Sequence, residues 1–250
     1  SNTQQTRLQD GDDTSTAQAR MDYLKGDQSE EVTEGGDFRK RDSILGDIVN
    51  SEPVYTHDEA YGYQDYITAG GKSYVEFARD PENKRPPMLY VGGNDGMLHA
   101  IDANTGEEVF SYVPDGVYDK LAELTDPGYQ HKYFVDGSPK VGDVYMNGTW
   151  RRILIGTLGN GGDTVFALDI TDPKNFDKDD VLWEFSDPEL GAGVSEVSLV
   201  RVRHKDGATV KTRWDVILGN GYNSASHDSR IFVLDPEDGS VRQELVAGSG

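Results

Sequence analysis

Glycine-rich turns are the first feature of this sequence that could carry chemistry. Residues 159–162 read Gly-Asn-Gly-Gly and residues 219–221 read Gly-Asn-Gly, which matches the first half of a dinucleotide-binding fingerprint. The third glycine of that fingerprint is missing, and an apolar strand pattern follows where a helix would be needed. We therefore expect these glycines to supply positive φ angles in hairpin turns, and we predict no phosphate or cofactor site here.

Histidines and clustered carboxylates are the candidates for a metal site. The five histidines have no His-x-His or His-x-x-x-His pairing; they are His57, His99, His131, His204 and His227. Acidic residues cluster at 10–13 and 177–180, but neither run alternates its aspartates as a calcium loop does. We interpret both as solvated loops. The sequence therefore predicts no metal site. We expect this segment to bind Ca²⁺ with a dissociation constant of roughly millimolar, or not at all.

The sequence contains no motif typical of an activated nucleophile. There is no cysteine, no Gly-x-Ser-x-Gly elbow, and no pair of carboxylates in a recognisable apolar pocket. Without cysteine there are also no disulfides and no thiolate metal sites. We predict that the protein is not an enzyme.

Three repeats must position whatever function the chain has. Each contains an apolar strand, a turn rich in Gly and Asn, a second apolar strand ending in aspartate, and a third strand after a short turn. The closing aspartates, Asp102, Asp169 and Asp235, recur at nearly equal intervals. Aspartate before a turn usually caps that turn through its side chain, so we interpret all three as architectural.

A short additional strand precedes each repeat. Ser-Glu-Pro-Val at 51–54 and Ser-Pro-Lys-Val at 138–141 begin two of these strands, and 195–197 is a weaker copy without proline. Proline cannot donate to a sheet ladder, so it marks a strand start or edge. Four strands per repeat make the blade of a β-propeller, and we predict an all-β fold with quinoprotein-like blades. The predicted blades lie near residues 44–113, 135–185 and 193–247.

Two long excursions interrupt the blades. Residues 114–136 include apolar positions at i, i+4 and i+7, which predicts one short helix. Residues 56–87 are rich in tyrosine, a residue suited to interfaces, and Tyr61, Tyr63 and Tyr66 are the predicted partner-binding residues. Packing of these three rings over the blade edge explains the pattern equally well.

Three blades do not close a ring, because known propellers use about four to eight. An open arc exposes strand edges and apolar blade faces. We therefore predict that residues 44–250 form part of a larger propeller and are not an autonomous domain. Residues 1–43 are polar and acidic with few apolar positions, and we predict a linker or loosely attached lead-in.

The formal net charge of −21 arises from 45 acidic and 24 basic residues. Such a surface repels phosphate, which argues against a nucleic-acid partner. The charge is dispersed along the chain and favours solubility in a salty or extracellular medium. No apolar run approaches the roughly 18 residues of a membrane-spanning helix, so we predict that the chain is not transmembrane.

Several motifs taken together resemble the propeller of the PilC/PilY family of type IV pilus-associated proteins. The resemblance covers about residues 21 to 247 in order. The motifs lie at 45–55, 90–100, 135–139, 159–162, 165–173 and 219–224. This resemblance implies an extracellular protein of the pilus tip and outer membrane. It also implies that the protein works with minor pilins, promotes pilus assembly, opposes retraction and attaches to host or abiotic surfaces.

The family commonly carries an Asp-rich calcium loop in its propeller, and this segment shows no such loop. Calcium is therefore possible only for the full-length family domain. The third repeat also departs from the family, because Glu196 stands where proline is expected.

Two alternatives stay open: a quinoprotein-type dehydrogenase and a periplasmic scaffold propeller without a pilus role. The dehydrogenase would need a tryptophan platform and a calcium–pyrroloquinoline site. Trp150, Trp183 and Trp214 lie at or near strand positions and suggest no single platform.

Overall fold

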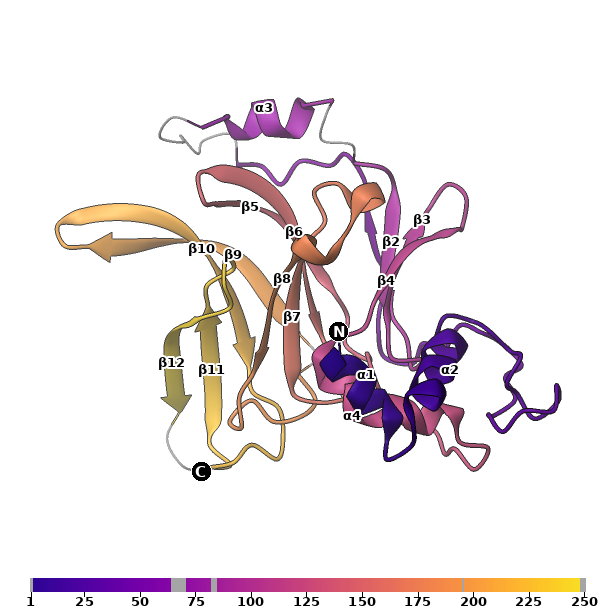
Figure 1. Cartoon of the computed structure of the whole chain (residues 1–250). Helices are drawn as coiled ribbons and strands as arrows, with labels where there is room; N and C mark the ends of the chain where they lie inside the picture. The colour runs from indigo at the N-terminus through magenta and orange to yellow at the C-terminus, as the bar shows by residue number, and fades with distance from the viewer. Residues whose placement is uncertain (1, 64–70, 82–84, 195, 248–250) are drawn as a thin grey trace.

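Three four-stranded antiparallel sheets stand side by side in the protein (Figure 1). The computed structural model describes residues 2–63, 71–81, 85–194 and 196–247. Blade 1 contains β1 (Val54–Thr56), β2 (Met88–Gly92), β3 (Leu98–Asp102) and β4 (Glu108–Tyr112). Blade 2 contains β5 (Lys140–Met146), β6 (Thr149–Thr157), β7 (Thr164–Asp169) and β8 (Val181–Ser186). Blade 3 contains β9 (Val197–Asp206), β10 (Thr209–Gly219), β11 (Ser229–Leu234) and β12 (Val241–Ala247).

Strands adjacent in sequence pair within every blade, which is the meander that the repeats predicted. Pro53 and Pro139 immediately precede β1 and β5, the first strands of their blades. There they set the entry direction of the chain and remove no donor from the ladder. The predicted fold class, an all-β protein built of propeller blades, is confirmed.

The closing aspartates cap their turns as expected. Asp102, Asp169 and Asp235 each accept a hydrogen bond from the backbone N–H two residues further on, at 2.9 to 3.0 Å. The second carboxylate oxygen of each binds a basic side chain: Lys174 for Asp102, Arg151 for Asp169 and Arg242 for Asp235. The repeated aspartate therefore ties a turn to a neighbouring strand or loop.

Apolar cores fill the spaces between adjacent blades. On β6, Leu154 packs in the core shared with blade 1, whereas Ile153 and Ile155 pack in the core shared with blade 3. All three side chains are completely buried. The alternation follows from the two-residue period of a strand, and burial of both faces explains the continuous apolar run.

The turn glycines correct one expectation. Gly159 has φ +54°, as predicted for a turn, but Gly161 and Gly221 do not have positive φ. A Cβ atom on Gly161 would lie 1.7 Å from the carbonyl oxygen of Phe134, and one on Gly221 equally close to that of Ala192. These two glycines allow the turn to contact the chain that enters the blade, so close approach rather than φ requires them.

Residues 1–43 differ from the predicted loose lead-in, because α1 (Asn2–Gln9) and α2 (Thr14–Leu24) form there. Leu8 and Ala17 are buried in the core of blades 1 and 2, and Tyr23 is buried against Phe38. Arg7 adds 2.6 Å ion pairs to Asp115 and Asp119. A few anchors suffice because the two short helices need only cover one end of an existing core.

Short helical elements lie in the connections between strands. They are α3 (Tyr74–Arg79), η1 (Asp115–Val117), α4 (Tyr118–Leu121), η2 (Ala122–Thr125), η3 (Pro173–Asn175) and η4 (Lys178–Asp180). The run from η1 to η2 is the short helix predicted within 114–136. Nowhere in the described residues is there a helix with the length and apolar character to cross a membrane.

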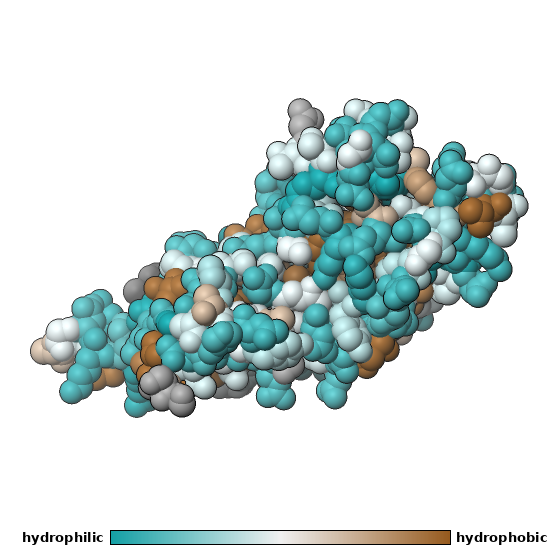
Figure 2. Space-filling view, turned by 90° about the horizontal axis from the view of Figure 1, so that it is seen from below, coloured by the Kyte–Doolittle hydropathy of each residue, from teal (hydrophilic) through white to brown (hydrophobic). Residues whose placement is uncertain are grey.

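The first and last blades each have one face that no described blade covers. On blade 3, Ile231 pairs with Leu245 across β11 and β12, and these side chains are 44% and 47% exposed. Both point away from the face on which Phe232 packs against blade 2. On blade 1, Tyr55 is 53% exposed. Apolar (brown) residues reach the surface at several places between hydrophilic ones (Figure 2).

A buried histidine ties the β2–β3 turn to β4. The ring of His99 lies 3.1 Å from Asp95 and 2.7 Å from Glu108, and Asp95 also accepts the backbone N–H of Gly46 at 2.6 Å. Burial lowers the pKa of His99, but the two carboxylates outweigh burial and raise it to about 8. The imidazolium therefore carries its charge between two acids at neutral pH.

This raised pKa predicts a pH dependence of stability. The contribution of His99, about 2 kcal/mol, is fully present below the unfolded pKa of about 6.5 and is lost as pH rises through 8. We expect the melting temperature to fall between pH 6 and pH 9, and the fall to shrink in His99→Gln. A variant with the same fall as the unmodified protein would contradict this role of His99.

Candidate functional site

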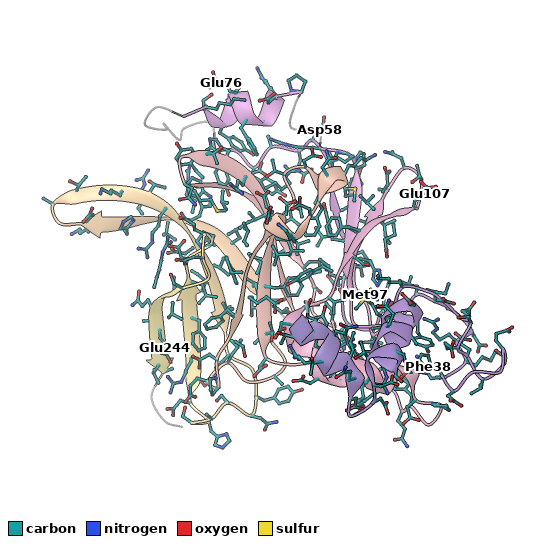
Figure 3. All side chains as sticks on the ribbon, in the orientation of Figure 1. Phe38, Asp58, Glu76, Met97, Glu107 and Glu244 are labelled. Carbon is teal, nitrogen blue, oxygen red and sulfur yellow. The ribbon has the colours of Figure 1, made fainter. Side chains whose placement is uncertain are left out.

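The excursion between β1 and β2 contains the tyrosines predicted to bind a partner. The helix of this excursion, α3, lies above blade 2 in Figure 1. Figure 3 labels Asp58, in the part of the excursion before α3, and Glu76, on α3 itself. Ser73 begins α3 with a capping box: its Oγ accepts the Glu76 N–H, and its own N–H donates to the Glu76 carboxylate. The cap fixes the helix so that Tyr74 and Phe77 are buried in the core between blades 2 and 3.

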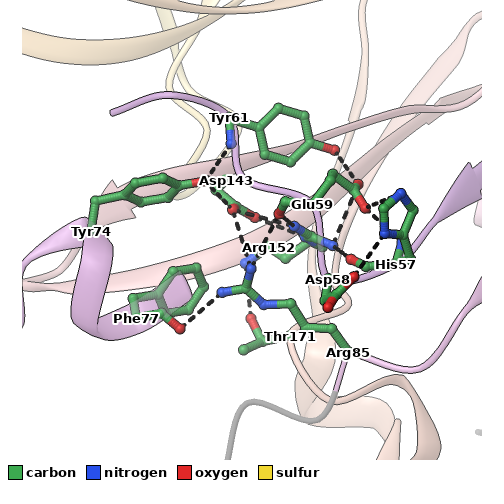
Figure 4. Close-up of polar contacts among 10 residues, drawn as sticks. All are labelled: His57, Asp58, Glu59, Tyr61, Tyr74, Phe77, Arg85, Asp143, Arg152 and Thr171. Atoms are coloured by element: carbon green, nitrogen blue, oxygen red, sulfur yellow. Dashed lines mark hydrogen bonds and ion pairs between the residues drawn. The ribbon is translucent and has the colours of Figure 1, made fainter. Parts of the chain in front are cut away.

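One buried carboxylate holds this excursion on blade 2 (Figure 4). Asp143 on β5 is completely buried and accepts 2.8 Å hydrogen bonds from Arg152 Nε and from the Tyr74 hydroxyl. Arg85 lies 3.9 Å from the same carboxylate, and its side chain is 4% exposed. Burial raises the pKa of Tyr74, so its hydroxyl remains a donor. Asp143 therefore joins two parts of the excursion to the blade.

Arg152 on β6 completes the attachment. Its guanidinium donates to the backbone carbonyls of His57 and Glu59 while its Nε remains on Asp143. Burial lowers the pKa of Arg152, but Asp143 outweighs burial and the net shift is upward. The two buried arginines face Asp143 and the partly exposed Glu59, so the buried charges are compensated.

Tyr61 and Tyr63 lie on this attachment, and both are half-buried. The backbone N–H of Tyr61 donates to the Tyr74 hydroxyl at 2.6 Å, and the Tyr61 hydroxyl donates to the Glu59 carboxylate at 3.0 Å. Tyr63 stacks on Trp150, with ring centroids 5.9 Å apart, and meets Trp214 edge-on. Tyr66 lies outside the described residues. Two of the three tyrosines thus pack on blades 2 and 3, and partner binding by their exposed parts stays a prediction.

The arrangement holds the β1–β2 excursion on blade 2. Among the described residues, no group of three or more histidine, aspartate or glutamate side chains could hold a metal ion. The carboxylate at the centre, Asp143, is occupied by the donors described above. What the geometry provides is a fixed surface above blade 2, built on a buried ion pair.

Sequence reasoning missed Asp143, Arg85 and Arg152. A signal was present, because Asp143 and Arg152 interrupt apolar strand patterns at positions expected to be buried. Buried charges in proteins are normally paired, so two such interruptions on adjacent strands indicate a pair.

Comparison with known proteins decides the family. The family model of the PilY1 beta-propeller domain matches residues 45–249. The chain belongs to this PilY1 family. It is 41% identical over 237 residues to a type IV pilus biogenesis factor PilY1 homolog of Xylella fastidiosa, and 38% identical over 235 residues to the type IV pilus biogenesis factor PilY1 of Pseudomonas aeruginosa strain PAK. These matches cover 93% and 91% of this chain but 19% of either relative.

A solved structure agrees with the family assignment. The crystal structure of the P. aeruginosa PilY1 C-terminal domain matches with a TM-score of 0.56 and 34% identity, over 76% of this chain and 37% of that one. A europium-containing methanol dehydrogenase matches with a TM-score of 0.35 and 15% identity, which is too low to support the dehydrogenase alternative. The PilY1 assignment therefore rests on sequence and fold together.

Proposed function

We propose that the protein carrying this segment is a non-enzymatic type IV pilus biogenesis factor. The observation that carries the proposal is the match of the PilY1 propeller family to residues 45–249. In the finer form of the proposal, the protein is extracellular at the pilus tip or outer membrane and works with minor pilins. It promotes assembly, opposes retraction and attaches the cell to host or abiotic surfaces.

Deletion of the gene and complementation with altered full-length protein test this proposal. We expect the deletion to reduce the pili recovered by shearing from the cell surface, and the unmodified gene to restore them. A gene lacking residues 44–250 should not restore them. Normal piliation without any copy of the gene would contradict the proposed function.

We further propose that Tyr66 and the exposed parts of Tyr61 and Tyr63 contact a partner. Serine at all three positions is expected to lower pilus assembly or attachment severalfold, because tyrosine supplies large amphipathic contact area. Tyr133→Ser, at an exposed tyrosine outside the β1–β2 excursion, is the control. A lowered melting temperature with unchanged assembly and attachment would mean that the tyrosines serve packing alone.

We also propose that this segment works without a cofactor and that any calcium dependence belongs to other parts of the full-length protein. The described carboxylates form no preformed cage, and affinity near micromolar requires one. Calorimetry of Ca²⁺ titrated into residues 1–250 should show binding no tighter than roughly millimolar. Tight stoichiometric uptake would overturn the proposal, and Asp177, Asp179 and Asp180 would then be the first residues to substitute.

A further inference from the structure

A groove of about 590 Å³ lies between α2, residues 39–47 and the β2–β3 turn of blade 1, away from the tyrosine excursion. Figure 3 labels two residues near the groove. Phe38 immediately precedes the wall formed by residues 39–47, and Met97 lies two residues after Asp95 of the β2–β3 turn. Its apolar lining includes Leu24, Ile44, Leu45 and Leu124. Ile44 and Leu45 are 51% and 43% exposed, so apolar surface is accessible at the groove.

The carboxylates that line the groove are already engaged. Asp42 pairs with Lys40 at 2.9 Å, and Asp47 pairs with His131 at 2.7 Å. Asp95 binds His99 and the backbone of Gly46, as described above. The acidic side chains here therefore have basic or donor partners of their own.

Two donor side chains at the groove, those of Arg39 and Asn94, have no acidic partner among the described residues. Arg39 donates its Nε to the Leu124 carbonyl at 3.0 Å and stacks over Tyr129, but within the described ranges it forms no ion pair with a carboxylate. Asn94 is 4% exposed, and its Oδ1 accepts the Phe134 N–H at 3.0 Å. Its Nδ2 has no hydrogen-bond partner in the described part of the chain. This Nδ2 atom is itself buried, so Arg39 is the donor that a ligand in the groove can reach.

We propose that this groove docks a segment of a partner polypeptide that presents a carboxylate beside a leucine-sized side chain. The carboxylate pairs with Arg39. The apolar side chain packs against Leu24, Ile44 and Leu124. Charge complementarity favours this occupant, because Arg39 is a guanidinium without an acidic partner in a chain of net charge −21. The docking chemistry is independent of the proposed pilus role.

Ligand-observed saturation-transfer NMR on the full-length protein tests the proposal with two matched probes, N-acetyl-leucine and N-acetyl-leucinamide. We expect the acid to receive severalfold more saturation than the amide, and the difference to shrink at least fivefold in Arg39→Gln. Arg203→Gln, at an exposed arginine outside the groove, should leave the difference unchanged.

Several outcomes would overturn the proposal. Equal signals from the two probes would remove the role of the carboxylate, and no signal from either would mean that the protein's own chain fills the groove. An unchanged difference in Arg39→Gln would place binding elsewhere. If Arg39→Gln does not fold, raising NaCl from 0.15 to 0.6 M must weaken the signal of the acid and spare that of the amide, because only the acid binds by charge.

Discussion

Replacing Asp143 with alanine is expected to lower the free energy of unfolding by about 3–5 kcal/mol. The substitution removes the acidic partner of Arg152 and Arg85, whose side chains are 3% and 4% exposed, and leaves two cations buried without it. It also removes the acceptor of the Tyr74 hydroxyl. Chemical denaturation of the protein with its complete propeller measures the loss.

Matched variants separate this effect from the removal of an ordinary charge. Asp42→Ala breaks the exposed pair with Lys40 and should change the free energy of unfolding by no more than about 0.5 kcal/mol. Tyr74→Phe removes one hydrogen bond to Asp143 and should cost about 1 kcal/mol. An Asp143→Ala loss as small as that of Asp42→Ala would show that Asp143 does not hold the excursion.

Lysine at both Ile231 and Leu245 is expected to have opposite effects in two settings. In residues 1–250 alone, the two charges should suppress association through the uncovered face of blade 3. In the protein with its complete propeller, they should lower the free energy of unfolding by about 2–5 kcal/mol, because we expect a further blade to pack on this face and bury them. Light scattering and denaturant unfolding measure the two effects.

Val210→Lys is the control for this pair, since Val210 is 61% exposed on β10 near the turn that joins it to β9. It should leave both association and the free energy of unfolding nearly unchanged. If the Ile231 and Leu245 substitutions are equally neutral in the longer protein, no blade packs on this face.

The blades could be predicted from sequence because their signals are local. Strand alternation, Pro53 and Pro139 at strand starts, and Asp102 and its two counterparts at turns each depend on a few adjacent residues. The repetition of these signals identified the blade, and the longer motifs identified the family.

What the sequence did not predict depends on contacts between distant segments. Asp143 meets Tyr74 only when the excursion folds back over blade 2. Glycine is needed at position 161 because the carbonyl oxygen of Phe134 leaves no room for a Cβ atom, and no pattern in the neighbouring residues predicts this contact. The lead-in looked like a linker because only a few of its side chains are apolar. The signal that marked α2 was Asp13, whose carboxylate accepts the Thr16 N–H at 2.9 Å as an N-cap.

We propose that these three blades form an open arc of a larger PilY1 propeller. Exposed apolar surface costs about 25 cal/mol per Å², so several hundred Å² on the two outer faces would offset several of the roughly 5–15 kcal/mol that stabilise a domain. The most direct test is calorimetric melting, with light scattering, of residues 1–250 against a longer chain that includes the downstream blades. We expect association or a broad, low-temperature transition for the segment and a sharp transition for the longer chain. A monomeric segment that melts cooperatively at the same temperature as the longer chain would contradict the claim.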